Sequence, residues 1–180
     1  MIFREAEIAG AWLLTLERRS DERGFFARIW CEDELRKQNL VVELAQINTA
    51  FSPKAGTLRG MHYQVSPHDE VKLVRCLRGA VYDVAVDLRP RSPTYMRWVG
   101  VTLSAEDGGL FYVPAGCAHG YLTLSDDAEV MYLASTPYAA QSARGVRFDD
   151  SAFGIRWPGE VKIISTADRE WKDFIGPDAQ

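Results

Sequence analysis

Residues 71–88, with the sequence VKLVRCLRGAVYDVAVDL, carry the densest strand signal in the chain. Apolar residues, many of them β-branched, alternate with polar ones, as is typical of strands that are buried on one face. The dipeptide Arg78-Gly79 interrupts this alternation and suits a turn. The segment therefore predicts a hairpin of strands 71–76 and 81–88, on which Lys72 and Asp83 would ordinarily face solvent.

Short strands are also predicted on both sides of this segment. They cover residues 11–16, 25–30, 41–48, 56–64, 98–104, 110–113, 119–124 and 129–135, with a charged loop at 17–24. Helices are predicted only at 31–39 and at 166–174, where Trp171 and Phe174 would dock on the strands. Because helices do not alternate with strands, the pattern argues against a parallel α/β sheet and predicts an all-β sandwich or barrel.

The composition predicts one domain that spans residues 1–180 and has a substantial core. The chain is 47% hydrophobic, and a chain of this size can bury about 70% of its unfolded surface. The net charge is −4, and no tract of lysines and arginines is present. The sequence therefore argues against a nucleic-acid partner.

The cysteines and the N-terminus bear on the cellular compartment. Cys31, Cys76 and Cys117 are odd in number and form no C-x-x-C pair, which favours a reducing, cytoplasmic compartment over a disulfide framework. The first residues, MIFREAEIAG, include acids and lack the apolar stretch of a signal peptide. No apolar run approaches the ~20 residues that span a bilayer, so no membrane association is expected.

The stretch GTLRGMHYQ at 56–64 combines polar side chains with two glycines. We interpret it as a strand entered from a tight loop. Regular alternation would place Arg59 on one face and His62 on the other. Histidine titrates near neutral pH and suits proton transfer, although a lone histidine in a strand is more often a core or surface residue.

Polar residues on other predicted strands strengthen the case for a site. They are Lys72, His119 in the segment PAGCAHG at 114–120, and Tyr132. In a small barrel, strands far apart in sequence can point inward at one cavity. A cavity holding two imidazoles, two cations and a phenol suits acid–base chemistry.

Several motifs in one order resemble the dTDP-4-dehydrorhamnose 3,5-epimerase family, over residues 23–168. They are RGFF at 23–26, QIN at 46–48, GTLRGMHYQ at 56–64, KLVRC at 72–76, DVAVDLR at 83–89, PAGCAHGY at 114–121, RGVRFDD at 144–150 and GIRWP at 154–158. The resemblance implies a cupin-type jelly roll that works as a homodimer, without a metal or other cofactor. It also implies a substrate that is a nucleotide-linked 4-keto-6-deoxyhexose, epimerised at C3 and C5.

The resemblance further implies the catalytic roles. His62 matches the base that removes the proton beside the C4 ketone, and Tyr132 matches the acid that returns a proton from the opposite face. Lys72 would stabilise the enolate oxygen. Asp168 matches the carboxylate that accepts a hydrogen bond from the base, although Asp83 competes for this role.

The substrate contacts implied by the resemblance form a second group. Arg59 and His119 match contacts to sugar and diphosphate, and Tyr138 matches the aromatic residue that stacks on the base. The remaining candidates for contact with the nucleotide sugar are Arg23, Phe26, Gln46 and Asn48. The chain departs from the family pattern at Arg28 and Ala143, where acids that help to bind the nucleotide are usual.

Three alternatives stay open from the sequence. An enzyme of the same type could epimerise C3 alone or C5 alone. A metal-dependent cupin is disfavoured, because His62-Tyr63-Gln64 lacks the H-x-H spacing of metal ligands. A sugar-binding barrel without catalysis is the third alternative. Separately, His68 is interpreted as a loop residue without a functional role.

Overall fold

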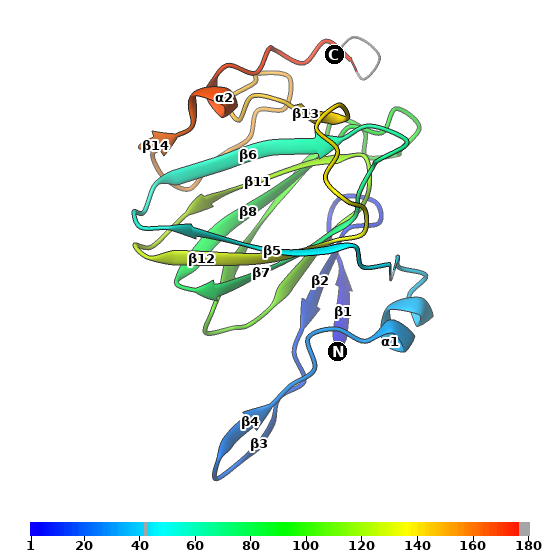
Figure 1. Ribbon diagram of the computed structural model, residues 1–180, viewed down its shortest axis with the longest axis vertical. Coiled ribbons are helices and arrows are strands. Elements are labelled where there is room, and N and C mark those ends of the chain that lie inside the picture. The colour runs from blue at the N-terminus through cyan, green and yellow to red at the C-terminus, as the bar shows by residue number, and fades with distance from the viewer. Residues whose placement is uncertain (42, 177–180) are drawn as a thin grey trace.

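The computed structural model describes residues 1–41 and 43–176, and two layered sheets dominate it (Figure 1). The first sheet has the order β1 (Ile2–Glu5), β2 (Trp12–Thr15), β10 (Leu110–Val113), β7 (Lys72–Arg78), β12 (Ala128–Ala134) and β5 (Gln46–Ser52). The second has the order β13 (Ala143–Gly145), β6 (Thr57–Gln64), β11 (Cys117–Thr123), β8 (Ala80–Asp87) and β9 (Trp98–Ser104). Neighbours within both orders run antiparallel, and β14 (Ile163–Ile164) joins β6 in parallel.

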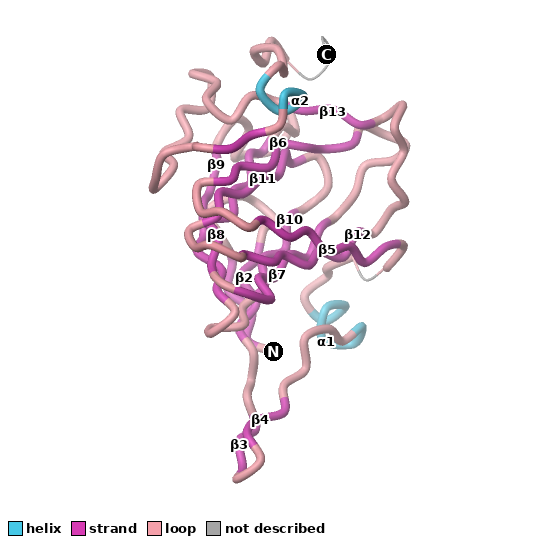
Figure 2. The backbone as a smooth tube through the Cα atoms, turned by 60° about the vertical axis from the view of Figure 1, so that its left-hand side comes forward, coloured by secondary structure: helices cyan, strands magenta, loops and turns pink. Residues whose placement is uncertain are grey.

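The smaller elements complete an all-β fold with short helices, as the sequence predicts. β3 (Arg19–Asp21) and β4 (Gly24–Phe26) form a hairpin that projects away from the two sheets (Figures 1 and 2). The helices are α1 (Glu32–Lys37) and α2 (Thr166–Arg169). Among the described residues, no helix has the length and apolar character needed to cross a membrane.

The main core fills the space between the two sheets. Buried side chains from both sheets meet there, including Val74, Phe111 and Val130 from the first sheet and Val81, Ala85 and Leu103 from the second. A second cluster packs residues 27–40 onto the outer face of the first sheet. A third packs residues 146–157 and Phe174 onto the outer face of the second. Apolar packing on both faces of the sheets is the main stabilising contribution.

The predicted hairpin of strands 71–76 and 81–88 is wrong. β7 pairs with β10 and β12, whereas β8 pairs with β9 and β11 in the other sheet. The turn at Gly79, where φ is +70°, therefore carries the chain from one layer to the other. Alternation identifies a strand, but the partner of that strand depends on contacts far along the chain.

The predicted faces of β6 are also wrong, because this strand contains a β-bulge. Arg59 and His62 are three residues apart, yet their partners on β11, Tyr121 and His119, are only two apart. One extra residue reverses the alternation, so Arg59 and His62 project to the same side. Gly60 permits this arrangement, since its φ is +119° and a Cβ there would lie 2.6 Å from the backbone of β11.

Several predicted boundaries shift. The strand predicted at 25–30 ends at Phe26, and part of the charged loop predicted at 17–24 forms β3. The strand predicted at 41–48 begins at Gln46 and continues to Ser52, while Val42 lies outside the described residues. The helix predicted at 166–174 ends at Arg169. The segments between these elements pack as irregular chain, because their apolar residues cover neighbouring sheets rather than pair in them.

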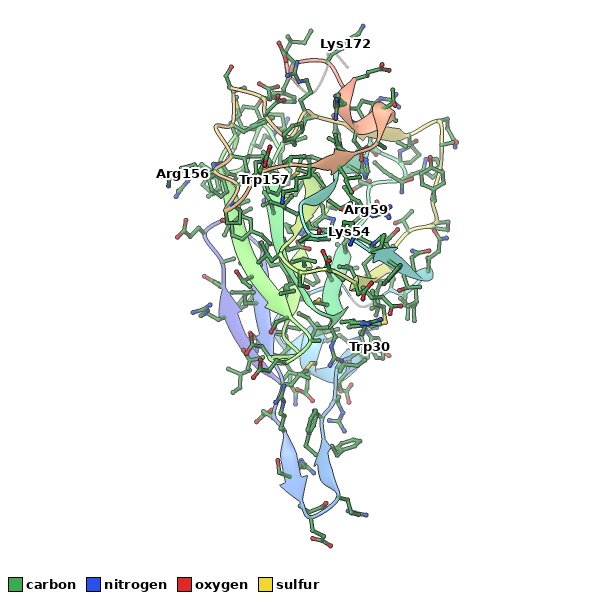
Figure 3. All side chains as sticks on the ribbon, turned by 90° about the vertical axis from the view of Figure 1, so that its left-hand side faces the viewer. Trp30, Lys54, Arg59, Arg156, Trp157 and Lys172 are labelled. Carbon is green, nitrogen blue, oxygen red and sulfur yellow. The ribbon has the colours of Figure 1, made fainter. Side chains whose placement is uncertain are left out.

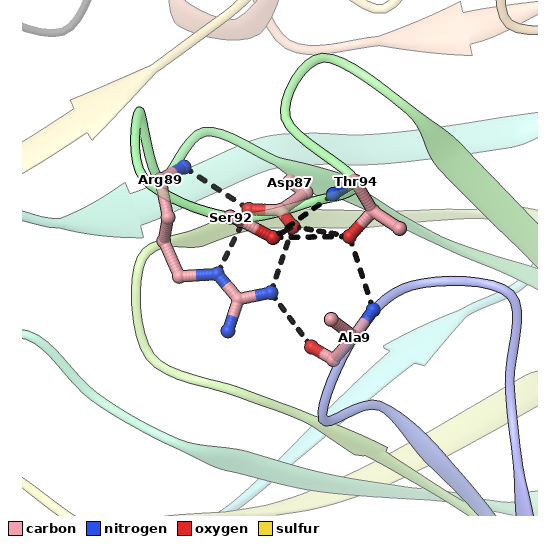
Figure 4. Close-up of polar contacts among 5 residues, drawn as sticks. All are labelled: Ala9, Asp87, Arg89, Ser92 and Thr94. Carbon is pink, nitrogen blue, oxygen red and sulfur yellow. Dashed lines mark hydrogen bonds and ion pairs between the residues drawn. The ribbon is translucent and has the colours of Figure 1, made fainter.

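A buried carboxylate ties together two loops at one end of the sheets (Figure 4). Asp87 is fully buried and accepts hydrogen bonds from Arg89 Nε and Nη2, both at 2.8 Å, and from Thr94 Oγ1 at 2.7 Å. Arg89 and Thr94 in turn bond the backbone of Ala9. Burial acts to raise the pKa of Asp87, but donors from Arg89, Ser92 and Thr94 lower it to about 2. The carboxylate is therefore ionised at neutral pH and fully hydrogen-bonded.

Candidate active site

His62 on β6 and Asp168 on α2 meet at the edge of the second sheet. His62 Nε2 lies 2.5 Å from Asp168 Oδ1, and the backbone N–H of Gly60 donates to Oδ2 at 3.2 Å. Ser165 caps α2 by accepting a hydrogen bond from the Asp168 N–H. The imidazole and the Gly60 N–H thus orient the carboxylate, while the Ser165 cap fixes the Asp168 backbone.

The environments of these two side chains differ. Burial acts to raise the pKa of Asp168, but the hydrogen bond and charge of His62, together with the Gly60 and Ser165 donors, bring it below its usual value. The carboxylate is therefore ionised at neutral pH. The His62 side chain is 48% exposed. A ligand can reach the imidazole while its partner stays buried, which is the geometry expected of an oriented general base.

A second histidine–aspartate pair lies beside the first. His119 on β11 is the cross-strand partner of His62, and its Nε2 lies 2.8 Å from Asp83 Oδ1. Asp83 is fully buried, and its Oδ2 atom has no hydrogen-bond partner among the described residues. Asp83 therefore contacts His119, whereas Asp168 contacts His62.

Lys72 lies behind the first pair, at the start of β7. Its Nζ is 3.4 Å from the backbone oxygen of His62 and 2.9 Å from Glu70 Oε1. Both charged side chains are nearly buried, so Lys72, like Asp83, does not face solvent. Sequence reasoning assigned no role to Glu70, because an acid in a loop before a strand looks like a solvated charge.

Tyr132 on β12 comes from the opposite sheet. Its cross-strand neighbours are Asn48 on β5 and Val74 on β7, and it packs against the core between the sheets. Burial raises the pKa of the Tyr132 phenol, the charge of Glu70 raises it further, and Arg59 opposes this. The phenol therefore keeps its proton at neutral pH and can act as a proton donor.

Arg59 carries a guanidinium available to an anion. It donates to Ser52 Oγ at 3.2 Å and to the Phe51 carbonyl at 3.1 Å, both uncharged acceptors. No carboxylate among the described residues pairs with it. Figure 3 shows its side chain in the body of the molecule, far from the tip of the β3–β4 hairpin. An arginine without an acid partner suits recognition of phosphate oxygens.

Tyr138 is presented on a loop that two glutamines hold. Its side chain is 68% exposed, and its backbone N–H donates to Gln46 Oε1 at 2.6 Å. Gln64 is buried and accepts from the Ala139 N–H at 2.6 Å while donating to the Pro137 and His68 carbonyls. His68 also lies 2.9 Å from Ser142 Oγ, which makes it a tie between loops.

Arg23 and Phe26 are not brought to this site within one chain. Both lie on the β3–β4 hairpin, at the end of the molecule opposite β6 and α2 (Figures 1 and 2). Phe26 is 64% exposed, and the exposed Arg23 pairs with Asp21 of the same hairpin.

The two positions at which the chain departs from the family pattern lie on different elements. Arg28 pairs with Glu34, and Ala143 lies on β13 opposite Gln64.

The donors at the site do not form a metal cluster. Among residues 1–41 and 43–176, no group of three His, Cys, Asp or Glu side chains is arranged to hold a metal ion. The two imidazoles are instead each engaged by one carboxylate.

Comparisons with known proteins concern the whole chain and its fold. The family model of dTDP-4-dehydrorhamnose 3,5-epimerase matches residues 5–175. The dTDP-4-dehydrorhamnose 3,5-epimerase of Sinorhizobium fredii is 45% identical over 158 residues, which cover 88% of this chain and 81% of that protein. The crystal structure of the enzyme of this name from Elizabethkingia anophelis NUHP1 superposes with a TM-score of 0.94 at 36% identity, covering 97% of this chain and 96% of the other.

A related activity occurs on the same fold. A 3'-monoepimerase from Streptomyces bikiniensis, solved in complex with dTDP-quinovose, superposes with a TM-score of 0.83 at 36% identity, covering 91% of this chain and 83% of the other. The family match spans nearly all of the described residues, and the Sinorhizobium fredii enzyme is 45% identical over 88% of this chain. The chain therefore belongs to the dTDP-4-dehydrorhamnose 3,5-epimerase family.

Proposed function

We propose that this protein is an isomerase that epimerises C3 and C5 of a nucleotide-linked 4-keto-6-deoxyhexose. Hydrogens on these carbons lie beside the C4 ketone, so removal of either proton gives an enolate. Inversion then requires a base on one face of the sugar, an acid on the other, and a group that stabilises the oxyanion. The half-exposed His62 held by an ionised, buried Asp168 is the observation that carries this proposal.

His62 acts as the base and Tyr132 as the acid. The hydrogen bond to Asp168 orients the imidazole and stabilises the imidazolium that forms when the proton is taken. Tyr132 belongs to the opposite sheet and keeps its proton at neutral pH, which suits delivery from the other face of the ring. Lys72 stabilises the enolate oxygen, because a fixed cation in a buried position needs little reorganisation.

The nucleotide part of the substrate binds the more exposed groups. Arg59 and His119 contact the sugar and diphosphate, Gln46 and Asn48 contact the nucleotide sugar, and the exposed ring of Tyr138 stacks on the base. The complex of the Streptomyces bikiniensis monoepimerase with dTDP-quinovose supports a dTDP-linked ligand. No metal or other cofactor takes part, and Gln64 supports this view because its amide is used in backbone hydrogen bonds.

The working form is a cytoplasmic homodimer. Arg23 and Phe26 contact substrate only if the β3–β4 hairpin reaches the site of a second copy, since the hairpin points away from β6 and α2 of its own chain (Figures 1 and 2). The exposed aromatic rings of Phe25 and Phe26 on this hairpin support such a contact. The free cysteines support a reducing compartment.

One experiment tests the reaction and counts the carbons involved. The protein is incubated in deuterated water with dTDP-4-keto-6-deoxyglucose, and deuterium is located by NMR. Label at both C3 and C5, with inverted product, is the expected result. Label at C3 alone would favour the monoepimerase alternative, for which the Streptomyces bikiniensis relative gives a precedent. Binding without any label would indicate a sugar-binding protein.

A further inference from the structure

Asp168 reaches His62 because a C-terminal strap, residues 163–174, crosses β6. Upstream of Asp168, β14 pairs with the start of β6, Ile163 opposite Thr57. Downstream, the Phe174 N–H donates to the buried Asp150 carboxylate at 2.6 Å, and the Phe174 ring packs on Phe153 at 5.2 Å. The part of the strap nearest to Asp168 lies between these anchors.

Trp171 anchors this middle part of the strap by packing on Gly145. A Cβ built on Gly145 would lie 2.2 Å from Trp171 Cε2 and 2.4 Å from Nε1, so the indole occupies the space that any other residue would fill. Gly145 lies on β13, directly opposite His62 on β6. The indole therefore rests on the backbone that flanks the base, three residues beyond Asp168.

We propose that Trp171, seated on Gly145, is a positioning residue that holds Asp168 against His62. The inference rests on the proposed function, in which these two residues form the catalytic pair. The wild-type α2 helix is a single turn capped by Ser165, and a helix this short has little stability without tertiary packing. Packing of the indole on β13 supplies that support next to the carboxylate.

Two features of the contact make the proposal sharply testable. Trp171 Nε1 is buried but donates to no acceptor among the described residues. Trp171→Phe therefore keeps the aromatic packing without losing a hydrogen bond, whereas Trp171→Ala loses the packing. Gly145 does not have the positive φ that disfavours side chains, so Gly145→Ala acts by displacing the indole rather than by straining the backbone.

The experiment measures kcat, KM and the pH dependence of kcat/KM for these variants. Misplacing a catalytic group by about 1 Å costs on the order of 100-fold in rate, so Trp171→Ala and Gly145→Ala should each lower kcat by about tenfold or more, with KM changing little. Trp171→Phe should stay within about twofold of wild type. Gly159→Ala is the matched control, because a Cβ there meets its nearest neighbour at an ordinary 4.0 Å.

Measuring Trp171→Ala in the Asp168→Asn protein distinguishes a positioning role from a general loss of structure. In the Asp168→Asn protein, Trp171→Ala should cause no more than about a twofold further loss, because the pair it supports is already broken. The acid limb of the pH profile should move in the same direction in Trp171→Ala as in Asp168→Asn. Thermal unfolding identifies variants that fail to fold. If Trp171→Ala does not fold, Gly145→Ala tests the same contact by changing the other residue.

The possible failures are distinguishable. Unchanged kcat in both Trp171→Ala and Gly145→Ala, or a full additional loss in the Asp168→Asn background, overturns the positioning role of Trp171. Wild-type turnover in His62→Asn overturns the proposed function itself, whatever the Trp171 variants do.

Discussion

The imidazoles of His62 and His119 are cross-strand neighbours, yet each binds a different carboxylate, Asp168 for His62 and Asp83 for His119. Asp168→Asn should therefore lower kcat by roughly 100-fold or more while nucleotide affinity stays near wild type, because it acts on the base. Asp83→Asn should instead weaken binding of dTDP, because it acts on His119. Steady-state kinetics and calorimetry check both. Glu170→Gln, an exposed neighbour on the same strap, is the control, and equal effects of both aspartate variants on kcat would contradict the assignment.

Glu70 should set the alkaline limit of activity. Its charge raises the pKa of the Tyr132 phenol, so Glu70→Gln removes that charge and lowers this pKa. If Tyr132 is the acid, the alkaline limb of the kcat–pH profile moves to lower pH, since the phenol then loses its proton earlier. Glu129→Gln, which lies on the same strand three residues from Tyr132, should leave the limb in place. An unmoved limb in Glu70→Gln would argue for a different proton donor.

The buried Asp87 should govern stability in acid. Its pKa falls from the ordinary 3.8 to about 2 on folding, so its contribution is fully present above about pH 4 and is lost as the pH falls through about 2. A shift of this size corresponds to roughly 2 kcal/mol of unfolding free energy. Urea unfolding should show Asp87→Asn destabilised by about that much or more at pH 7, with a flatter acid dependence. The exposed Asp107→Asn should behave like wild type; unchanged stability of Asp87→Asn would contradict the role of the cluster.

The proposed homodimer, in which the β3–β4 hairpin reaches the site of the other copy, predicts complementation between two inactive variants. His62→Asn and Arg23→Ala should each be nearly inactive alone. If Arg23 serves the partner's site, each mixed dimer has one site with both defects and one with neither, so co-expression should restore about a quarter of wild-type activity. If Arg23 serves its own site, every site in the mixture keeps one defect and activity stays at the level of the separate variants.

Local sequence identified most strands but not their partners. β9 and β10 have the predicted bounds, because clear turn residues flank these two apolar-rich segments. The supposed hairpin at 71–88 failed, since the choice between pairing and crossing to the other layer is made by β10, β11 and β12, which come later in the chain.

In the candidate site, too, the sequence predicts local features but not contacts between distant strands. The family motifs predict the imidazole–carboxylate pair of His62 and Asp168 that the structure contains. The bulge at Gly60, which brings Arg59 to the side of His62, depends on a close approach to β11 that alternation cannot reveal. The sequence predicts no role for Glu70, because its pairing with the buried Lys72 arises only when the chain folds.

Solvent exchange in two variants tests the central claim most directly. In deuterated water, Tyr132→Phe should still exchange the hydrogen beside the ketone without inverting the carbon, because the half-exposed His62 removes the proton and renews its own from solvent. His62→Asn should show neither exchange nor inversion, while both variants bind dTDP as wild type does. Exchange at the wild-type rate in His62→Asn would show that another residue is the base.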